Sequence, residues 1–318
     1  MTPTQLRAFA AVVRLGSVKD AAAELGVTEA AVSGHVAMLR KELVDPLFSR
    51  TAAGLAFTPG GLRLATRAAE MLGLQDQTIR EVSAAGQGRR LLRLATSSLF
   101  AEHAAPGLIQ LFTSRAKDLD VELSVRPTGQ LGSLLTSRAA DVAIGPSEAL
   151  TAGDLQHRTF LKYQMAVVVG AGHALASGRP RPEALRDELW LLGPSAAEHT
   201  GVTRRMLHHF DVPEEGQRIF QSQAAALEEV SRGHGVGLAV TFAVGDDLAK
   251  GRLVQVDVRG ARAEGTWTAS TLPSHSATSA AAELCRFITT PRATQAMLQG
   301  VGATIGHFRP SVHVTLWS

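Results

Sequence analysis

Residues Ser17–Lys41 constrain the fold more than any other stretch, because they fit two short helices joined by one tight turn. Ser17 with Asp20 three residues later is a helix-start signature, since a hydroxyl and a carboxylate at this spacing pair with backbone N–H groups that a helix start leaves free. Gly26 suits the left-handed backbone that ends a helix. Thr28 can then cap the next helix. The sequence therefore predicts a capped helix pair.

The second helix of this pair is amphipathic. Its predicted buried stripe consists of Val32, Val36, Leu39 and Leu43, at helical spacing. The outward face is small at its start and basic at its end, and comprises Glu29, Ala30, Ser33, Gly34, His35, Ala37, Arg40 and Lys41. A small-residue face lets a helix enter a groove, as the second helix of a helix-turn-helix enters the DNA major groove. An ordinary helical hairpin in a globular core is the alternative interpretation of these residues alone.

The flanking sequence extends the pair into a larger unit. Thr2-Pro-Thr-Gln5 is another helix start, with a threonine cap and a proline at the first helical position. Residues 50–58 contain two short extended pieces around Gly54, a pattern typical of a hairpin. The result would be a three-helix unit with a wing. Arg50 at the base of the wing could reach the DNA backbone or the minor groove.

A long helix is predicted from Thr58-Pro59 to about residue 83. It carries an apolar seam made of Leu62, Ala65, Ala69, Leu72, Ile79 and Val82. The simplest way to bury this seam is against a helix of a second subunit. Packing on its own domain is the alternative. Residues 83–88 are rich in small residues and indicate a hinge.

From residue 91 onward, strands and helices alternate. Strands are expected at residues 91–95, 121–125, 141–144, 155–160, 163–170, 189–192, 218–221, 236–240, 253–258 and 267–272. One helix is expected over residues 98–115, and another closes the fold at residues 277–289. This order predicts an α/β fold with mostly parallel strands in two lobes. Ligands of such folds bind at the carboxyl ends of the strands, in the cleft.

Composition and absent motifs exclude several classes. The net charge of +3 is compatible with nucleic acid but does not require it. The single cysteine, Cys285, excludes an internal disulfide and a cysteine-rich zinc site, and its apolar context indicates buried filler. Gly233–Gly237 follows a helix and precedes a strand, the reverse of a dinucleotide loop. We expect no catalytic site, metal or cofactor. With no signal segment or spanning apolar run, we expect a cytoplasmic protein without a membrane partner.

The N-terminal region resembles LysR-type transcriptional regulators in the order and spacing of its residues. The resemblance is carried by Leu6-Arg-Ala-Phe9, Gly16-Ser17, Ala21-Ala22, Leu25, Val27-Thr28, Ala31-Val32-Ser33, Leu39, Leu43, Pro46-Leu47-Phe48, Arg50 and Thr58-Pro-Gly-Gly61. It is strongest over residues 1–65 and continues more weakly to about residue 290, through Asp141–Ile144 and Val230–Gly237. It implies a winged helix-turn-helix, a long dimerising linker helix and a two-lobed, periplasmic-binding-protein-like effector domain.

The resemblance also implies boundaries and a role. The DNA-binding domain would span residues 1–58, the linker helix and hinge 59–88, the effector domain 89–300 and an extension 301–318. Lobe I would comprise about residues 89–160 and 266–300, and lobe II about 161–265. Such a protein binds promoter DNA sequence-specifically as a dimer-based oligomer, a homodimer or homotetramer, under control of a small effector. The competing hypothesis is a two-lobed binding or catalytic protein whose N-terminal hairpin serves only for assembly.

Matching positions give candidate DNA contacts. These are Thr28, Ser33, His35 and Arg50, followed by Glu29, Ala30 and Arg40. The family usually has glutamine where this chain has Glu29. A carboxylate there could accept from cytosine N4 and alter operator preference, or could favour the helix start through the dipole.

The resemblance also implies an effector site between the lobes, and the positions that match it here follow the strand ends. They are Thr96, Ser97, Ser98, Thr128, Gly129, Ser195, Gln221 and Ser222. Hydroxyls and helix starts at such positions bind carboxylates well, so a carboxylate is the first candidate for an effector of unknown identity. The alternative is that the serines only cap helices. The apolar residues of the 301–318 extension indicate packing on its own domain or at a subunit contact.

Overall fold

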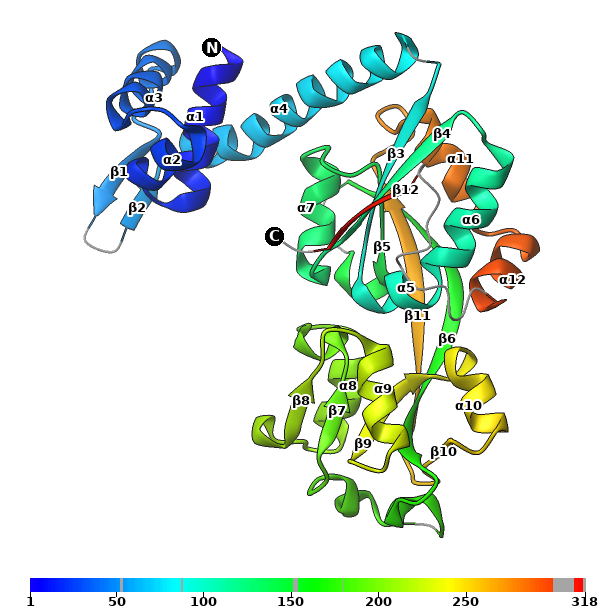
Figure 1. Ribbon diagram of the computed structural model, residues 1–318. Helices are drawn as coiled ribbons and strands as arrows, with labels where there is room; N and C mark the ends of the chain where they lie inside the picture. Colours follow the sequence, from blue (N-terminus) through cyan, green and yellow to red (C-terminus); the bar gives the residue numbers. More distant parts are fainter. Residues whose placement is uncertain (52–53, 87, 151–153, 179, 300–311, 317–318) are drawn as a thin grey trace. The chain divides into compact units, whose positions relative to one another are not determined.

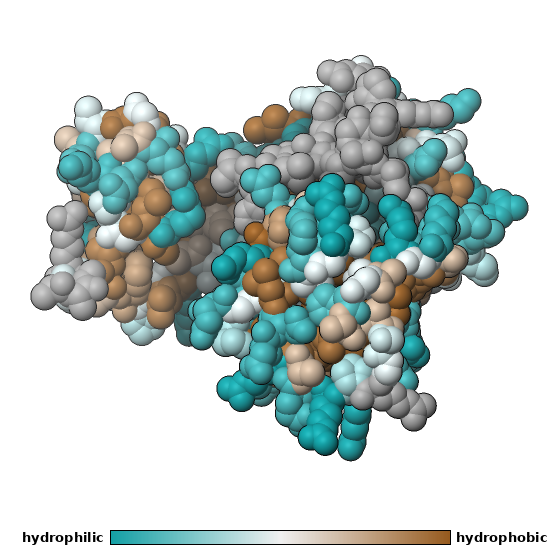
Figure 2. All heavy atoms as spheres, turned by 60° about the horizontal axis from the view of Figure 1, so that its bottom comes forward, coloured by the Kyte–Doolittle hydropathy of each residue, from teal (hydrophilic) through white to brown (hydrophobic). Residues whose placement is uncertain are grey.

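The computed structural model describes residues 1–51, 54–86, 88–150, 154–178, 180–299 and 312–316 (Figure 1). The chain divides into two compact units, Met1–Ser83 with Thr136–Ala139, and Ala84–Leu135 with Ala140–Ser318. On the face presented in Figure 2, hydrophobic side chains lie among hydrophilic ones.

The N-terminal unit is a winged helix-turn-helix with a long following helix. Its elements are α1 (Pro3–Leu15), α2 (Val18–Leu25), α3 (Glu29–Leu43), β1 (Phe48–Thr51), β2 (Gly54–Phe57) and α4 (Pro59–Gly86). The two strands pair antiparallel, with Phe48 opposite Phe57. The predicted helices and hairpin are therefore present.

The predicted caps are confirmed. Thr2 and Gln5 form a reciprocal capping box at the start of α1. The Ser17 hydroxyl accepts from the backbone N–H of Asp20, and Gly26 ends α2 with a φ of 65°. These contacts depend on neighbours in sequence only, which is why the sequence could predict them.

The core under α3 differs from the prediction at one position. Val32, Val36 and Leu39 are buried, but Leu43 is 40% exposed, so its assignment to the buried stripe was wrong. Leu47 and Phe48 close the core instead, and the Phe48 ring stacks on Phe9 with 6.1 Å between centroids. The chain reverses at Val44, where the backbone is left-handed, so the last turn of α3 extends past this core.

The apolar seam of α4 is open to solvent at three of its six predicted positions. Leu62, Ile79 and Val82 are 57%, 55% and 68% exposed, whereas Leu64 and Ala68 are buried. Ala65 and Leu72 of the predicted seam are half-buried and pack on the N-terminal core beside Leu64 and Ala68, so the seam is divided between this core and solvent.

The second unit contains one mixed sheet that runs through two lobes. Its order is β12-β4-β3-β5-β11-β6-β9-β7-β8, with β10 paired to β6. The strands are β3 (Arg90–Thr96), β4 (Leu119–Val125), β5 (Val142–Pro146), β6 (Gln156–Gly170), β7 (Trp190–Leu192), β8 (Gln217–Ile219), β9 (Val236–Val240), β10 (Leu253–Gln255), β11 (Arg262–Thr271) and β12 (Val312–Leu316). The antiparallel pair β6 and β11 joins the lobes (Figure 1).

Each lobe combines parallel strands with helices. Lobe I has β3, β4, β5 and β12 with α5 (Ser98–His103), α6 (Ala105–Arg115), α7 (Leu131–Thr136), α11 (Ser279–Phe287) and α12 (Pro291–Gln299). Lobe II has β7 to β10 with α8 (Val202–His209), α9 (Gln223–Ser231) and α10 (Gly245–Ala249). Neighbours β3 and β4, β3 and β5, and β7 and β9 are parallel. The α/β, two-lobed fold is confirmed.

Two element predictions need correction, and one helix was not predicted. The strands expected at 155–160 and 163–170 are one continuous strand, β6, in which Leu161 and Tyr163 are buried while Lys162 is exposed. The helix expected over 98–115 breaks at Ala104, because Pro106 lacks the N–H that would continue it. The helix α12 was not predicted, although Thr290 before Pro291 is a cap signal.

Part of the C-terminal extension joins the sheet. β12 runs parallel to β4, with Val312 opposite Val121. Residues 301–311 and 317–318 of the extension lie outside the described residues. The pairing supports packing of this segment on its own domain. The predicted domain boundaries stay predictions.

Candidate nucleic-acid interface and interlobe cleft

The first half of α3 presents the predicted contact residues at its surface. Thr28, Glu29, Ala30 and Ser33 are exposed, and His35 is half-buried. The Thr28 hydroxyl accepts from the Ala31 backbone N–H at 3.2 Å, which leaves the hydroxyl hydrogen available to an acceptor outside the helix. The helix start therefore offers small polar groups with little side-chain bulk around them.

Arg40 serves the wing rather than the outer face. Its guanidinium lies 4.7 Å from the centroid of the Phe48 ring. The same guanidinium donates to the Phe48 backbone oxygen at 2.8 Å. Arg50 lies in β1 opposite Leu55, and its side chain is outside the described residues.

Sequence reasoning overlooked one residue of this surface. Met38 of α3 is 57% exposed and lies beside the small-residue face, one turn after Gly34. It was overlooked because an apolar residue in a helix is most often buried.

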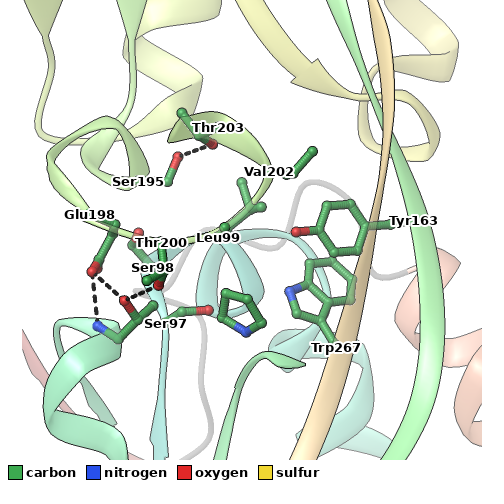
Figure 3. Close-up of a pocket in the computed structure, with 13 residues that line it drawn as sticks. Ser97, Ser98, Leu99, Tyr163, Ser195, Glu198, Thr200, Val202, Thr203 and Trp267 are labelled. Atoms are coloured by element: carbon green, nitrogen blue, oxygen red, sulfur yellow. Dashed lines mark hydrogen bonds between the residues drawn. The ribbon is translucent and has the colours of Figure 1, made fainter. Parts of the chain in front are cut away.

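A small cavity lies between the lobes (Figure 3). Its volume of about 20 Å³ has room for about one water molecule. It is lined by Ser97, Ser98, Leu99, Thr128, Pro146, Tyr163, Ser195, Glu198, Thr200, Gly201, Val202, Thr203 and Trp267. The structure thus brings together Ser97, Ser98, Thr128 and Ser195 of the predicted effector residues.

The floor of the cavity carries unsatisfied polar groups. The hydroxyls of Ser97 and Ser98 are buried and have no hydrogen-bond partner among the described residues. The indole N–H of Trp267 is in the same state, and this ring stacks on Tyr163 with 4.2 Å between centroids. Ser97 precedes α5 but makes no side-chain cap, so the capping interpretation is wrong for Ser97. Buried polar groups are normally paired, so these point to a water or a ligand.

The remaining predicted effector residues lie outside the cavity lining. Thr96 is buried and donates to the Ile144 backbone oxygen at 2.9 Å, which ties β3 to β5. Ser222 caps α9 by accepting from the Ala225 N–H, so for Ser222 the capping interpretation is confirmed. Gly129 and Gln221 are exposed. Within the cavity, the Ser195 hydroxyl pairs with that of Thr203 at 3.1 Å.

Two glutamates that sequence reasoning missed cross between the lobes. Glu198 accepts from the backbone N–H of Thr128 at 2.9 Å and from its hydroxyl at 2.8 Å (Figure 3). Glu102 of α5 accepts from the Gln223 backbone N–H at 2.7 Å, at the start of α9. Burial raises the pKa of Glu102 to about 6, against the opposing effect of the N–H groups of Gln223 and Ala224. Neither contact has a local sequence signal, because its partners lie far apart in the chain.

Two other groups that could take part in chemistry, the Cys285 thiol and the Arg205 guanidinium, are buried or paired within the fold. Burial raises the pKa of the Cys285 thiol to about 11, so the group is protonated near neutral pH and is a poor nucleophile. Arg205 of α8 forms an ion pair with Glu148, which also joins the two lobes. Over the described residues, no helix combines the length and apolarity that a membrane crossing requires.

Comparisons with known proteins agree with this architecture. The model of the bacterial regulatory helix-turn-helix protein, lysR family, matches residues 3–62, and that of the LysR substrate binding domain matches residues 85–291. The HTH-type transcriptional regulator Rv0377 of Mycobacterium tuberculosis is 59% identical, with 100% of both chains covered. The crystal structure of ArgP from Mycobacterium tuberculosis has a TM-score of 0.58 at 18% identity, covering 94% of this chain and 97% of that one. HinK from Pseudomonas aeruginosa has a TM-score of 0.52 at 19% identity, covering 93% and 98%.

Proposed function

The chain belongs to the LysR family of transcriptional regulators, and we propose that it reads promoter DNA with α3 and responds to a small molecule bound between its lobes. The observation that carries the DNA-binding part is the exposed, capped start of α3. Small polar side chains there leave the helix free to enter a major groove. The proposed role is regulatory and involves no catalytic step.

Specific residues receive roles in this proposal. Thr28 and Ser33 hydrogen-bond to phosphate or base edges, with Ala30 allowing the close approach. His35 lies two residues after Ser33 and is a further candidate contact, and Arg50 of the wing neutralises a phosphate. For Glu29 the proposal keeps both alternatives, acceptance from cytosine N4 and support of the helix start through the dipole.

We propose that α4 joins two subunits. The exposed residues Leu62, Ile79 and Val82 gain a buried environment if a second α4 packs against them. The resulting homodimer, alone or within a homotetramer, places two α3 helices on successive major grooves. Half-sites about one helical turn apart are then expected.

The cavity between the lobes is proposed as the effector site. Its support is the unsatisfied hydroxyls of Ser97 and Ser98 and the unsatisfied indole N–H of Trp267. A ligand that pairs with them favours one relative arrangement of the lobes. This change in the arrangement of the lobes would alter how the dimers are arranged on DNA and how strongly the DNA is bent.

A footprint on the DNA upstream of the protein's own gene, at fixed salt, tests the DNA-binding part. We expect a protected region with wild-type protein, and loss of protection with Ser33→Ala or Arg50→Ala. Lys250→Ala, an exposed change in lobe II, serves as the control and should protect as wild type does. Absence of any footprint would favour the competing hypothesis of a binding protein whose hairpin only mediates assembly.

A further inference from the structure

The cleft already contains a carboxylate of the protein itself. Glu198 of lobe II reaches the backbone N–H and the hydroxyl of Thr128 in lobe I, the position at which the sequence predicted a ligand carboxylate. The Thr128 hydroxyl also lies 3.2 Å from that of Thr200. Both donors of Thr128 are therefore engaged before any ligand arrives.

The charge of the cavity is set by this glutamate. None of the lining residues is Lys, Arg or His. The nearby Arg205 is paired with Glu148 and does not line the cavity. A ligand carboxylate entering here would meet a like charge, and none of the described residues that line the cavity carries a positive charge to offset it.

The second interlobe glutamate lies at another of the predicted effector positions. Glu102 of lobe I accepts from the backbone N–H of Gln223 in lobe II, next to Gln221 and Ser222. Two of the predicted strand-end positions, at Thr128 in lobe I and beside Ser222 in lobe II, are thus occupied by carboxylates of the chain itself, whereas the hydroxyls of Ser97 and Ser98 stay unpaired among the described residues.

We propose that Glu198 determines the specificity of the cleft: it excludes carboxylate effectors and selects an uncharged or cationic molecule with a hydrogen-bond donor for Glu198 and an acceptor for the Trp267 indole N–H. This inference rests on the proposed function of the cleft as the effector site. The expected effector therefore changes from a carboxylate to an uncharged or cationic molecule.

Vacating the position tests the proposal. Glu198→Ala removes the atoms of one acetate ion, and Glu198→Gly removes those of one propionate ion. We expect sodium acetate, but not sodium chloride of equal ionic strength, to raise the Tm of full-length Glu198→Ala protein saturably by about 2–4 °C. Propionate should be the better of the two anions for Glu198→Gly. Wild type and Glu183→Ala, a change at an exposed glutamate, should show no saturable rise.

Two outcomes would overturn the proposal. One is an acetate rise in wild type equal to that in Glu198→Ala. The other is the absence of an anion-specific rise in Tm in both Glu198→Ala and Glu198→Gly when both proteins unfold cooperatively. Two variants are used so that the test stands if one of them fails to fold. Adding Thr128→Val to Glu198→Ala should weaken acetate binding about 5-fold through the lost hydroxyl. A footprint by the same wild-type sample tests the DNA-binding part of the proposed function independently, so a failed acetate test with an intact footprint overturns this inference alone.

Discussion

Arg40 and Phe48 are joined twice, through the ring face at 4.7 Å and through the backbone oxygen of Phe48 at 2.8 Å. This contact connects α3 to the first strand of the wing. It gives Arg40, which the sequence placed among DNA-contact candidates, a structural role in holding the wing beside the helix.

Replacing Arg40 should therefore affect stability. Arg40→Lys keeps the charge but loses the planar group that stacks and donates at once. We expect a loss of about 1–2 kcal/mol in the free energy of unfolding of the N-terminal unit, measured by urea denaturation. Lys41→Arg, at an exposed neighbour, should change little. Equal stability of Arg40→Lys and wild type would remove the structural role.

Thr28 and Ser33 should separate stability from DNA binding. Thr28→Ala removes the cap of α3 and should cost about 1 kcal/mol of unfolding free energy. Ser33→Ala changes an exposed residue and should alter stability by less than about 0.5 kcal/mol. Both should weaken binding to the upstream DNA in a gel-shift titration. A Ser33→Ala protein that binds as wild type does would exclude Ser33 from the interface.

Arg93 and Asp141 form a buried ion pair with an N–O distance of 2.6 Å, and Asp141 also accepts from the Arg93 backbone N–H. Asp141→Ala should lower the unfolding free energy by about 3–5 kcal/mol, because a buried guanidinium loses its counter-ion. The matched change at an exposed pair, Asp118→Ala opposite Arg90, should have a small effect. Similar losses for both variants would contradict the importance of burial.

Glu102 should make stability depend on pH. Its folded pKa of about 6 lies above the usual glutamate value of 4.5 because burial penalises the charged form. The protonated Glu102 side chain contributes about 2 kcal/mol to the free energy of unfolding. This contribution is fully present below pH 4.5 and is lost as the pH rises through 6. Urea denaturation of Glu102→Gln should lack this component.

The neighbouring His103 changes stability with pH in the opposite direction to Glu102. Wild type and Glu102→Gln both contain this histidine. Burial lowers the pKa of His103 from 6.5 to about 4. The stability that the neutral side chain contributes is therefore lost as the pH falls from 6.5 through 4. The difference between wild type and Glu102→Gln isolates the glutamate. A difference that stays constant from pH 4 to pH 7 would contradict the assignment.

The proposed packing of α4 against a second subunit can be tested by placing a charged residue in the exposed part of its apolar seam. Ile79→Asp or Val82→Asp places a carboxylate in the exposed seam and should shift the assembly toward monomer in analytical ultracentrifugation. Thr78→Asp, at an exposed polar position on the same helix, is the control. Unchanged assembly in all three variants would argue for another dimer surface.

The parts of the fold that depend on near neighbours could be predicted from sequence. The caps at Thr2, Ser17 and Thr28 form within three residues, and the apolar spacing of α3 follows from helical geometry. Leu43 was misplaced because its exposure depends on where the chain reverses. The continuity of β6 depends on its pairing with β11, about a hundred residues later in the chain.

The cleft could be predicted only in outline. Ser97, Ser98, Thr128 and Ser195 follow strand ends, so topology brings them together. Glu198 reaches Thr128 across 70 residues, and Glu102 reaches Gln223 across 121. Such contacts depend on how the two lobes close on each other, which local pattern does not encode.

The most direct test of the central claim is the ratio of affinities for two DNA duplexes of equal length at the same salt concentration. One carries the footprinted upstream sequence and the other a scrambled version. A sequence-specific regulator should prefer the first by about 10³-fold or more. Equal affinities that fall equally steeply with salt would contradict the assignment of α3 as a reader of bases.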